Sequence, residues 1–195
     1  MNLEFFNLIN GLAHKNAYFD SLMIFFSKYV PYVFIAIVAG IFIKGIINKD
    51  SNSRKVAVHT AILTSINLAF AYIIGIVHYV DRPFVNNKVN LLFPHISDTS
   101  FPSDHATGTM SISLGLGKYN KLTGRILIGL SILVGFSRVY VGHHYPFDII
   151  GAYMIVLMVN FIYNTKVRDK IDKLYDKIEE IVKDKFENWK WKDNI

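Results

Sequence analysis

The sequence predicts an all-α integral membrane protein, a helical bundle of about five spans. Hydrophobic residues make up 52% of the 195 residues and charged residues only 18%, and the mean hydropathy is +0.30. A helix needs about 20 largely apolar residues to cross the hydrocarbon of a bilayer, and runs of this kind follow one another along the chain. Cysteine is absent, which excludes disulfides and thiol chemistry.

The elements can be assigned in order. Residues 1–13 are short and mixed, with apolar side chains about one helical turn apart, and they predict an N-terminal interfacial helix. Pro31 interrupts the first long run, where we expect a kink or an early helix boundary. The third run is the shortest and carries glycines and serines, which let helix backbones approach closely in a membrane. The predicted spans are residues 20–47, 56–80, 105–117, 122–141 and 147–163.

The tail, residues 166–195, predicts a C-terminal amphipathic cytoplasmic helix. Apolar residues recur at helical spacing from Ile171 to Val182, and lysines alternate with acidic residues between them. A solvated helix on the inner leaflet is the simpler interpretation, and a partner-binding surface is the alternative. We treat residues 1–195 as a single membrane-embedded domain, with its core at about 55–165.

The distribution of basic residues predicts the topology, because lysine and arginine collect on the cytoplasmic side of membranes. The connection between the first two spans holds four, the turn after the third holds three and the tail holds nine. The opposite side holds five: Lys15, Lys28, Arg82, Lys88 and Arg138. We therefore expect a multi-pass protein of a bacterial cytoplasmic membrane, with the 81–104 loop outside. The net charge of +6 indicates a partner with negative charge, and we favour the anionic lipid of the bilayer over nucleic acid.

Five ionisable residues lie at or beside the ends of the apolar runs, all on the predicted outer side. Ionisable residues near hydrocarbon are costly and mark functional sites. Two arginines attract an anion, and two histidines can supply a nucleophile and an acid. The set therefore indicates transfer of a phosphoryl group at a membrane surface. Its members are Arg82, His105, Arg138, His144 and Asp148.

The first two stretches that carry these residues each allow a purely structural interpretation. Arg82-Pro83 closes the second span, where an arginine can reach lipid headgroups without any catalytic role. Ser103 and Asp104 are good N-cap residues for the following helix. The start of a helix also offers free amides to an anion, however, with His105 beside them.

The third stretch joins the last two spans and has the most specific spacing. Five residues separate Arg138 of the Ser137-Arg138 pair from His144, and three more separate His144 from Asp148. Asp148 falls in the first turn of the last span. A carboxylate in this position can hold one imidazole nitrogen, so that the other acts as a nucleophile.

Taken in order, the three stretches resemble the signature of the type 2 phosphatidic acid phosphatase superfamily: Lys-x6-Arg-Pro, Pro-Ser-Gly-His and Ser-Arg-x5-His-x3-Asp. The third part is complete here, and the resemblance covers most of residues 60–165. The chain looks most similar to the bacitracin-resistance type of bacterial undecaprenyl-diphosphate phosphatase. The matching residues are Arg82, Pro83, Pro102, Ser103, His105, Ser137, Arg138, His144 and Asp148.

The resemblance implies hydrolysis of a polyprenyl diphosphate, undecaprenyl diphosphate, to undecaprenyl phosphate and phosphate on the outer side of the membrane. This reaction would recycle the carrier lipid for cell-wall synthesis and give bacitracin resistance. It implies that His144 forms a phosphohistidine, that His105 serves as general acid and base, and that Asp148 orients His144. No metal or other cofactor is expected, because arginines supply the positive charge. The implied phosphate-binding residues are Arg82, Ser103, Asp104 and Arg138.

The chain departs from the family pattern at two positions. The family lysine falls at Gly75, so the site lacks one positive charge unless His78, about a turn further on, replaces it. The glycine before the catalytic histidine is Asp104, and we expect its carboxylate to turn away from phosphate, where it can cap the helix or bond a histidine, while its amide faces the phosphate. The bacitracin-resistance type shares this aspartate.

Several alternatives stay open. A phosphatidate or phosphatidylglycerophosphate phosphatase carries the same signature, and a membrane transporter also places ionisable residues in a bundle. A zinc site could draw on His95, Asp98, His105, His143 and His144. No pair of these has a zinc-protease spacing, and the arginines would repel a cation. His95 and Asp98 either shape the pocket or are solvated, and we favour the second interpretation; we expect His143 to neighbour the nucleophile without its role.

Overall fold

The computed structural model describes residues 1–192, except for the side chains of residue 183 and residues 186–192. Residues 193–195 of the predicted tail lie outside this part. The chain forms two compact units, Met1–Asn160 and Phe161–Ile195, and each is described by itself. A single domain over residues 1–195 stays a prediction.

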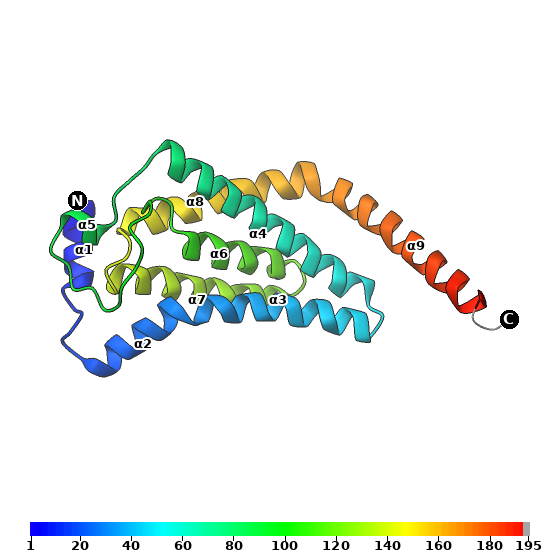
Figure 1. Ribbon diagram of the computed structural model, residues 1–195, viewed down its shortest axis with the longest axis horizontal. Coiled ribbons are helices and arrows are strands. Elements are labelled where there is room, and N and C mark those ends of the chain that lie inside the picture. Colours follow the sequence, from blue (N-terminus) through cyan, green and yellow to red (C-terminus); the bar gives the residue numbers. More distant parts are fainter. Residues whose placement is uncertain (193–195) are drawn as a thin grey trace. The chain divides into compact units, whose positions relative to one another are not determined.

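The described chain is helical, as the ribbon in Figure 1 shows, and its elements are α1 (Asn2–Asn10), α2 (Ala17–Lys28), α3 (Val30–Ile47), α4 (Ser51–Val77), α5 (Pro83–Asn86), α6 (Asp104–Gly117), α7 (Lys121–Tyr140), α8 (Pro146–Ile162), the π-helix η1 (Tyr163–Val167) and α9 (Arg168–Lys192). Of the described helices, four are long and apolar enough to cross a membrane: α3, α4, α7 and the helix that begins at Pro146. The predicted class, an all-α multi-pass membrane bundle, is confirmed. The third predicted span is α6, which has only 14 residues.

Polar caps and prolines fix the helix boundaries. The Asn16 carboxamide accepts hydrogen bonds from the amides of Tyr18 and Phe19, which begins α2. The break between α2 and α3 falls at Tyr29, and Pro31 lies in the first turn of α3, where its missing N–H costs nothing. The boundary predicted at Pro31 is thus confirmed.

Helix α6 lies between α4 and α7 and packs against both, with α3 beside it (Figure 1). Its glycines make these contacts close. A Cβ at Gly115 would lie 2.6 Å from the Thr60 hydroxyl of α4. On α7, a Cβ at Gly124 would lie 2.5 Å from the Cα of Gly117. The small residues of 105–117 therefore do what the sequence predicts, since they bring three backbones together.

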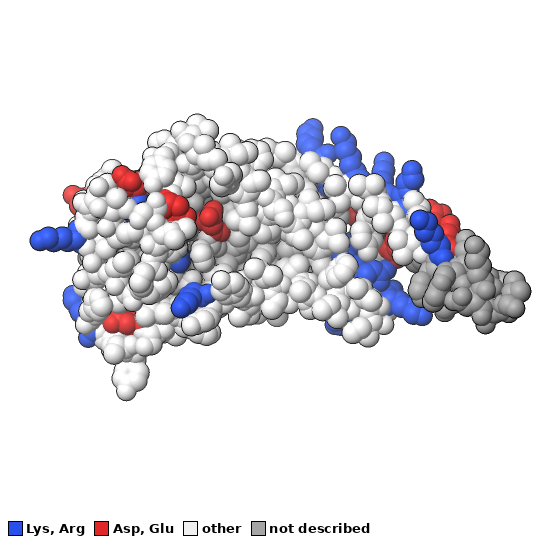
Figure 2. Space-filling view, in the orientation of Figure 1, with Lys and Arg blue, Asp and Glu red and all other residues white. Residues whose placement is uncertain are grey.

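The first unit carries apolar side chains on its outside as well as in its core. Large hydrophobic residues such as Ile73, Ile126 and Met154 are more than half exposed. A broad band across the helical bundle is free of charged atoms on the face shown in Figure 2. Because lipid tails cover such a band without cost, this surface fits a bilayer.

The two ends of the first unit differ in what they carry. At one end lie the connection from α4 to α6, the turn from α7 to α8 and helix α1 (Figure 1). Asn10 of α1 fastens this end, because its amide donates to the carbonyl oxygens of Asn90 and Tyr140 at 2.9 and 2.8 Å. Phe6 of α1 is fully buried against α6, α7 and α8. Whether α1 also lies in the membrane interface stays a prediction.

The second unit contains η1 and α9. Leu174, Ile178 and Ile181 of α9 are about half exposed. Arg168 lies 3.9 Å from Asp172, one turn along the helix. The predicted amphipathic helix is therefore present over residues 168–192.

Candidate active site

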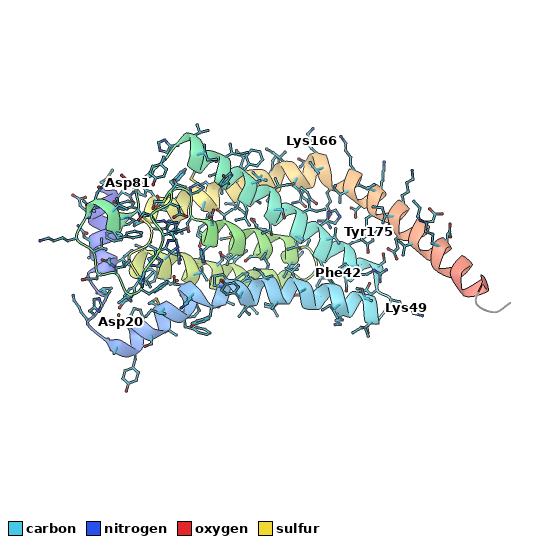
Figure 3. The ribbon with its side chains drawn as sticks, in the orientation of Figure 1. Asp20, Phe42, Lys49, Asp81, Lys166 and Tyr175 are labelled. Atoms are coloured by element: carbon cyan, nitrogen blue, oxygen red, sulfur yellow. The ribbon has the colours of Figure 1, made fainter. Side chains whose placement is uncertain are left out.

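The three signature stretches meet at the end of the bundle that carries α1. Arg82 precedes α5, Ser103 precedes α6, Arg138 lies in the last turn of α7, and Asp148 lies in the first turn of α8. Asp81, the neighbour of Arg82, and Lys49, in the turn between α3 and α4, mark opposite ends of the bundle in Figure 3.

His144 is 1% exposed, and both of its ring nitrogens have assigned partners. Nδ1 lies 2.8 Å from the backbone oxygen of Ser100, which can only accept, so Nδ1 carries the proton. Nε2 lies 2.9 Å from Nη1 of Arg82, which can only donate, so Nε2 carries the lone pair. His144 is therefore a neutral imidazole with its lone pair on Nε2, the form that a nucleophile needs.

Asp148 is buried beneath this histidine. One carboxylate oxygen accepts hydrogen bonds from the Ser100 hydroxyl at 2.5 Å and from the Tyr145 amide at 2.8 Å. The same oxygen lies 3.5 Å from His144 Nδ1. Asp148 thus acts on the imidazole through its charge and through Ser100, while the shortest bond to Nδ1 comes from the Ser100 carbonyl.

Arg82 connects the loop before α6 with His144. Its side chain is 4% exposed. Nε donates to the Asp98 carboxylate at 2.6 Å, and Nη1 donates to the backbone oxygen of His143 at 3.0 Å. These two bonds fix the plane of the guanidinium beside His144 Nε2.

Arg138 is the second buried arginine, 2% exposed. Nη1 donates to the Ser27 hydroxyl of α2 at 3.0 Å, and Nη2 lies 3.0 Å from Nε2 of His95. Its Nε has no hydrogen-bond partner among the described residues. A buried arginine with a free donor is costly, and an anion in this position would satisfy it.

The start of α6 supplies further donors. Ser103 is the N-cap residue of α6 and is fully buried, but its hydroxyl makes no capping bond and has no partner in the part of the chain that the structure describes. The first amides of α6 have no carbonyl partner within the helix, which makes them available to an anion. His105, one residue into the helix, is half-buried.

Burial and neighbouring cations hold the loop histidines neutral. The pKa of His144 is lowered well below its ordinary value, by burial first and then by Arg82 and Arg138. Burial and Arg138 also lower the pKa of His143, to about 2. Both imidazoles therefore stay uncharged at neutral pH.

The surroundings of His143 differ from those of His144, although its buried Nδ1 has no hydrogen-bond partner among the described residues. Its Nε2 lies 3.0 Å from the carbonyl oxygen of Phe93, so this nitrogen carries a proton. Its ring packs edge-on against Phe93 at 4.4 Å between centroids. This geometry agrees with a structural neighbour of the nucleophile.

The expectation that His95 and Asp98 are solvated is wrong. Asp98 pairs with Arg82 and His95 contacts Arg138, so the segment between α5 and α6 forms one wall of the site. Ser27 and Ser100 are two further site residues that the sequence does not indicate. Ser27 lies in the largely apolar helix α2 and Ser100 in the polar stretch before α6, and neither belongs to a motif that the sequence analysis used.

His78, the suggested substitute for the family lysine, lies elsewhere. Its side chain is exposed, and its ring lies 6.1 Å from that of Phe101. Asp104 is exposed and lines a cavity together with His105, and the expected turn of its carboxylate away from phosphate stays a prediction.

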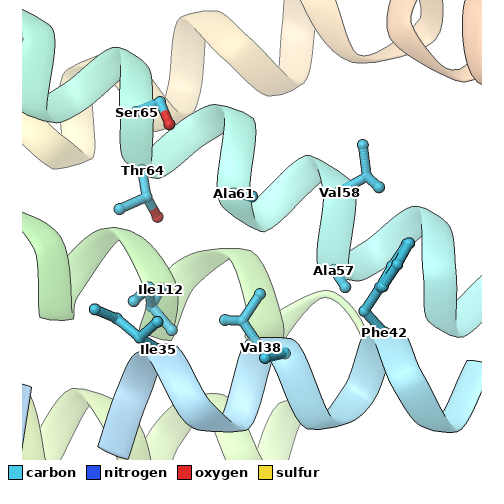
Figure 4. Close-up of a pocket in the computed structure, with 10 residues that line it drawn as sticks. Ile35, Val38, Phe42, Ala57, Val58, Ala61, Thr64, Ser65 and Ile112 are labelled. Atoms are coloured by element: carbon cyan, nitrogen blue, oxygen red, sulfur yellow. The ribbon is translucent and has the colours of Figure 1, made fainter. Parts of the chain in front are cut away.

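An apolar groove leads away from His105. A cavity of about 240 Å³ is lined by Asp104 and His105 at one end and by residues of α3, α4 and α6 beyond them. A second cavity of about 390 Å³ lies between α3 and α4, as Figure 4 shows. The two cavities share Ile35, Thr64 and Ile112 in their linings, and we call them together the α3–α4 groove.

Within the described chain, His, Cys, Asp and Glu side chains form no group of three or more that is arranged to hold a metal ion. The zinc-ligand alternative drawn from the sequence has no such cluster to rest on. Asp98 faces Arg82 instead, and His95 faces Arg138.

Residues 29–171 match the PAP2 superfamily model, and the chain belongs to this superfamily. The chain is 37% identical to the undecaprenyl-diphosphatase BcrC of Bacillus subtilis, over 84% of its own length and 82% of that protein's. It is 29% identical to the bacitracin transport permease protein BcrC of Bacillus licheniformis, over 92% of its own length and 90% of that protein's.

Solved structures agree with the fold. The crystal structure of LpxE from Aquifex aeolicus superimposes with a TM-score of 0.66 at 27% identity. The match covers 83% of this chain and 93% of that one. The chain is therefore a membrane phosphatase of the PAP2 type, and the resemblance drawn from the three stretches is confirmed.

Proposed function

We propose that this protein hydrolyses undecaprenyl diphosphate to undecaprenyl phosphate and inorganic phosphate. The observation that carries the proposal is the state of His144, a neutral imidazole whose Nε2 lone pair faces the buried Arg82, with the buried Arg138 near enough to lower its pKa. A relative at 37% identity bears the name of this activity.

The reaction starts with attack of His144 Nε2 on the terminal phosphorus. The new N–P bond forms as the bond from this phosphorus to the bridging oxygen breaks, and undecaprenyl phosphate leaves. His105 gives its proton to the leaving oxygen. General acid catalysis of this kind is worth about 10²–10⁴-fold in rate.

Hydrolysis of the phosphohistidine completes the cycle. His105, now neutral, takes a proton from a water molecule as the water oxygen attacks phosphorus. The N–P bond breaks, its electron pair returns to Nε2, and inorganic phosphate is released. Asp148 and the Ser100 carbonyl keep the proton on Nδ1 throughout, so that the same nitrogen is free for the next turnover.

Four groups are placed to hold the phosphoryl oxygens: Arg82, Arg138, the Ser103 hydroxyl and the first amides of α6. Two of them, Arg138 Nε and Ser103 Oγ, are buried donors without a partner among residues 1–192. Fixed donors in a dry site stabilise developing charge without reorganisation, which is the largest contribution in many enzymes.

The α3–α4 groove supports a lipid substrate. It begins at His105, which would protonate the leaving oxygen, and its remaining lining is almost wholly apolar. The leaving group carries the lipid chain, so the chain must start where His105 lies. We propose that the site faces the outside of a cytoplasmic membrane, supported by the excess of lysine and arginine at the opposite end of the sequence-predicted bundle.

Phosphate release by the purified protein tests the proposal. Undecaprenyl diphosphate, phosphatidate and phosphatidylglycerophosphate are compared side by side, with His144→Ala as the inactive control. We expect the highest kcat/KM with undecaprenyl diphosphate. A preference for either glycerolipid would replace the substrate, and full activity of His144→Ala would reject the mechanism.

Transport is the second candidate, because a relative at 29% identity is named a permease. Bacitracin tolerance separates the two. The drug binds the lipid diphosphate, so a phosphatase that removes this lipid raises tolerance through its chemistry. We expect expression of the protein to raise tolerance and His144→Ala to abolish the effect. Tolerance that survives in His144→Ala, at equal membrane abundance, would favour transport.

A further inference from the structure

The segment between α5 and α6 occupies the place where a lysine on α4 would point. A Cβ added to Gly75 would lie 2.5 Å from Cγ2 of Thr99, so a larger side chain does not fit there. The segment is held down by the Ser100 amide, which donates to the Val80 carbonyl at 2.7 Å. The Thr99 hydroxyl donates to the Phe101 carbonyl at 3.2 Å.

This fixed segment brings two titratable side chains to the buried arginines. Asp98 accepts from Arg82 at 2.6 Å, and its side chain remains 45% exposed. His95 approaches Arg138 at 3.0 Å. His143 lies on the other side of His95, with 4.6 Å between ring centroids. The groups that face His95 are thus two arginines, one carboxylate and two imidazoles, those of His143 and His105.

The hydrogen-bond partners of the two ring nitrogens define the tautomer of His95. Nδ1 lies 3.0 Å from the Ile96 carbonyl, so Nδ1 carries a proton. Nε2 accepts from Arg138 Nη2, so it carries a lone pair. Burial, followed by the charges of Arg82 and Arg138, lowers the pKa of this imidazole. His95 is therefore neutral beside an arginine whose Nε is free to bind an anion.

A phosphate dianion bound by Arg138 would change this balance. It would take the Nη2 hydrogen bond away from His95 and place negative charge within reach of Nε2. A proton on Nε2 would then turn the lone pair into a donor to a phosphate oxygen. The Ile96 carbonyl continues to accept from Nδ1, so the protonated ring keeps its orientation.

We propose that His95 is a third cationic ligand of the substrate diphosphate, a proposal that rests on the proposed phosphatase function. When the anion binds, Nε2 of His95 takes up a proton from solvent. It supplies the positive charge that Gly75 cannot carry. No bond other than N–H and hydrogen bonds changes in this step, and the proton returns to solvent when phosphate leaves.

The test measures proton uptake directly. Vanadate, a phosphate analogue, is titrated calorimetrically into the intact purified protein in two buffers of different ionisation enthalpy, at one pH near 7.5. The variants are His95→Gln, which keeps hydrogen bonding without a titratable proton, and His95→Lys, which supplies a fixed charge. His78→Gln is the matched control, because His78 lies at the end of α4, the helix that carries Gly75, and has an exposed side chain.

We expect wild type and His78→Gln to take up more protons per vanadate than His95→Gln does. His95→Gln should bind vanadate about tenfold more weakly, which corresponds to about 1.4 kcal/mol. His95→Lys should restore the affinity without restoring the proton uptake. A merely structural role for His95 would change affinity but not the number of protons.

Equal proton uptake in wild type and His95→Gln would overturn the proposal, as would a His78→Gln variant that loses the uptake. A circular-dichroism melt of each variant shows whether the fold is kept. If His95→Gln fails to fold, the uptake of His95→Lys against wild type decides. Failure of the wild type to hydrolyse undecaprenyl diphosphate would overturn the proposed substrate alone, because vanadate binding needs no lipid.

Discussion

Removal of the Ser100 hydroxyl isolates one contact beneath the nucleophile. In Ser100→Ala, Asp148 loses the 2.5 Å hydrogen bond from Oγ but keeps the 2.8 Å bond from the Tyr145 amide. The backbone oxygen of residue 100 still accepts from His144 Nδ1, so the tautomer is preserved. The variant therefore weakens the support of the carboxylate without turning the imidazole.

The magnitude follows from the burial of the pair. Ser100 is fully buried and Asp148 is 3% exposed, so water does not replace the lost bond. A hydrogen bond to a charged group contributes about 1.5–3 kcal/mol. Because the Tyr145 bond remains, we expect a loss at the lower end of this range. Each 1.4 kcal/mol of lost transition-state stabilisation lowers kcat about tenfold.

The assay is phosphate release from undecaprenyl diphosphate, with kcat and KM determined separately. Ser113→Ala is the matched control: Ser113 is also fully buried, and its hydroxyl bonds only the Thr109 carbonyl of its own helix, at 2.7 Å. Its kcat should not change. An unchanged kcat in Ser100→Ala, or a loss as complete as that of His144→Ala, would refute the reasoning.

Three other predictions follow from the site and the groove. Because the pKa of His144 lies well below its ordinary value, phosphoenzyme formation should persist as the pH falls below about 6.5; Arg82→Gln removes a cause of this shift and should move the acidic limit to higher pH, and an unmoved limit would contradict it. Ala61→Trp in the groove should raise KM for undecaprenyl diphosphate about tenfold, because it would displace about two buried methylenes of the lipid at about 0.8 kcal/mol each. The same variant should leave KM for farnesyl diphosphate unchanged. The control Ile132→Trp, at an exposed position, should leave the activity unchanged. Equal effects of Ala61→Trp on both lipids would show that the groove takes no part in the reaction. A cysteine at Asn87 should react with a membrane-impermeant thiol reagent in intact cells, and labelling only after lysis would reverse the topology.

The fold was predictable where the sequence repeats one physical rule. The lengths of the apolar runs predicted the long helices, and Pro31 predicted the boundary between α2 and α3. The count of spans was less secure, because α6 is short and owes its place to close packing. Gly115 against Thr60 and Gly117 against Gly124 fix this helix, and such pairs cannot be identified from one sequence.

The site was predictable for residues with a characteristic spacing. Arg82, Arg138 and His144 follow the signature, and the structure places Arg82 and His144 in direct contact. Ser27 and His95 meet Arg138 across 111 and 43 residues, from segments with no motif. Such contacts depend on how the α2 helix and the outer loop pack, and the charge and periodicity of the sequence carry no record of this packing.

The contact between Arg82 and His144 links binding of the phosphoryl group to exposure of the nucleophile. In the structure, Nη1 of Arg82 donates to the lone pair of Nε2 at 2.9 Å, so the attacking electrons are covered by the cation. The same guanidinium would bind a phosphoryl oxygen in the proposed reaction. In the proposed reaction, a phosphate oxygen replaces Nε2 of His144 as the acceptor of the hydrogen bond from Nη1. The lone pair of Nε2 then becomes free to attack phosphorus. In the proposed reaction, Arg82 thus protects a buried neutral imidazole until substrate is bound, and in the structure Asp98 holds the guanidinium in this position.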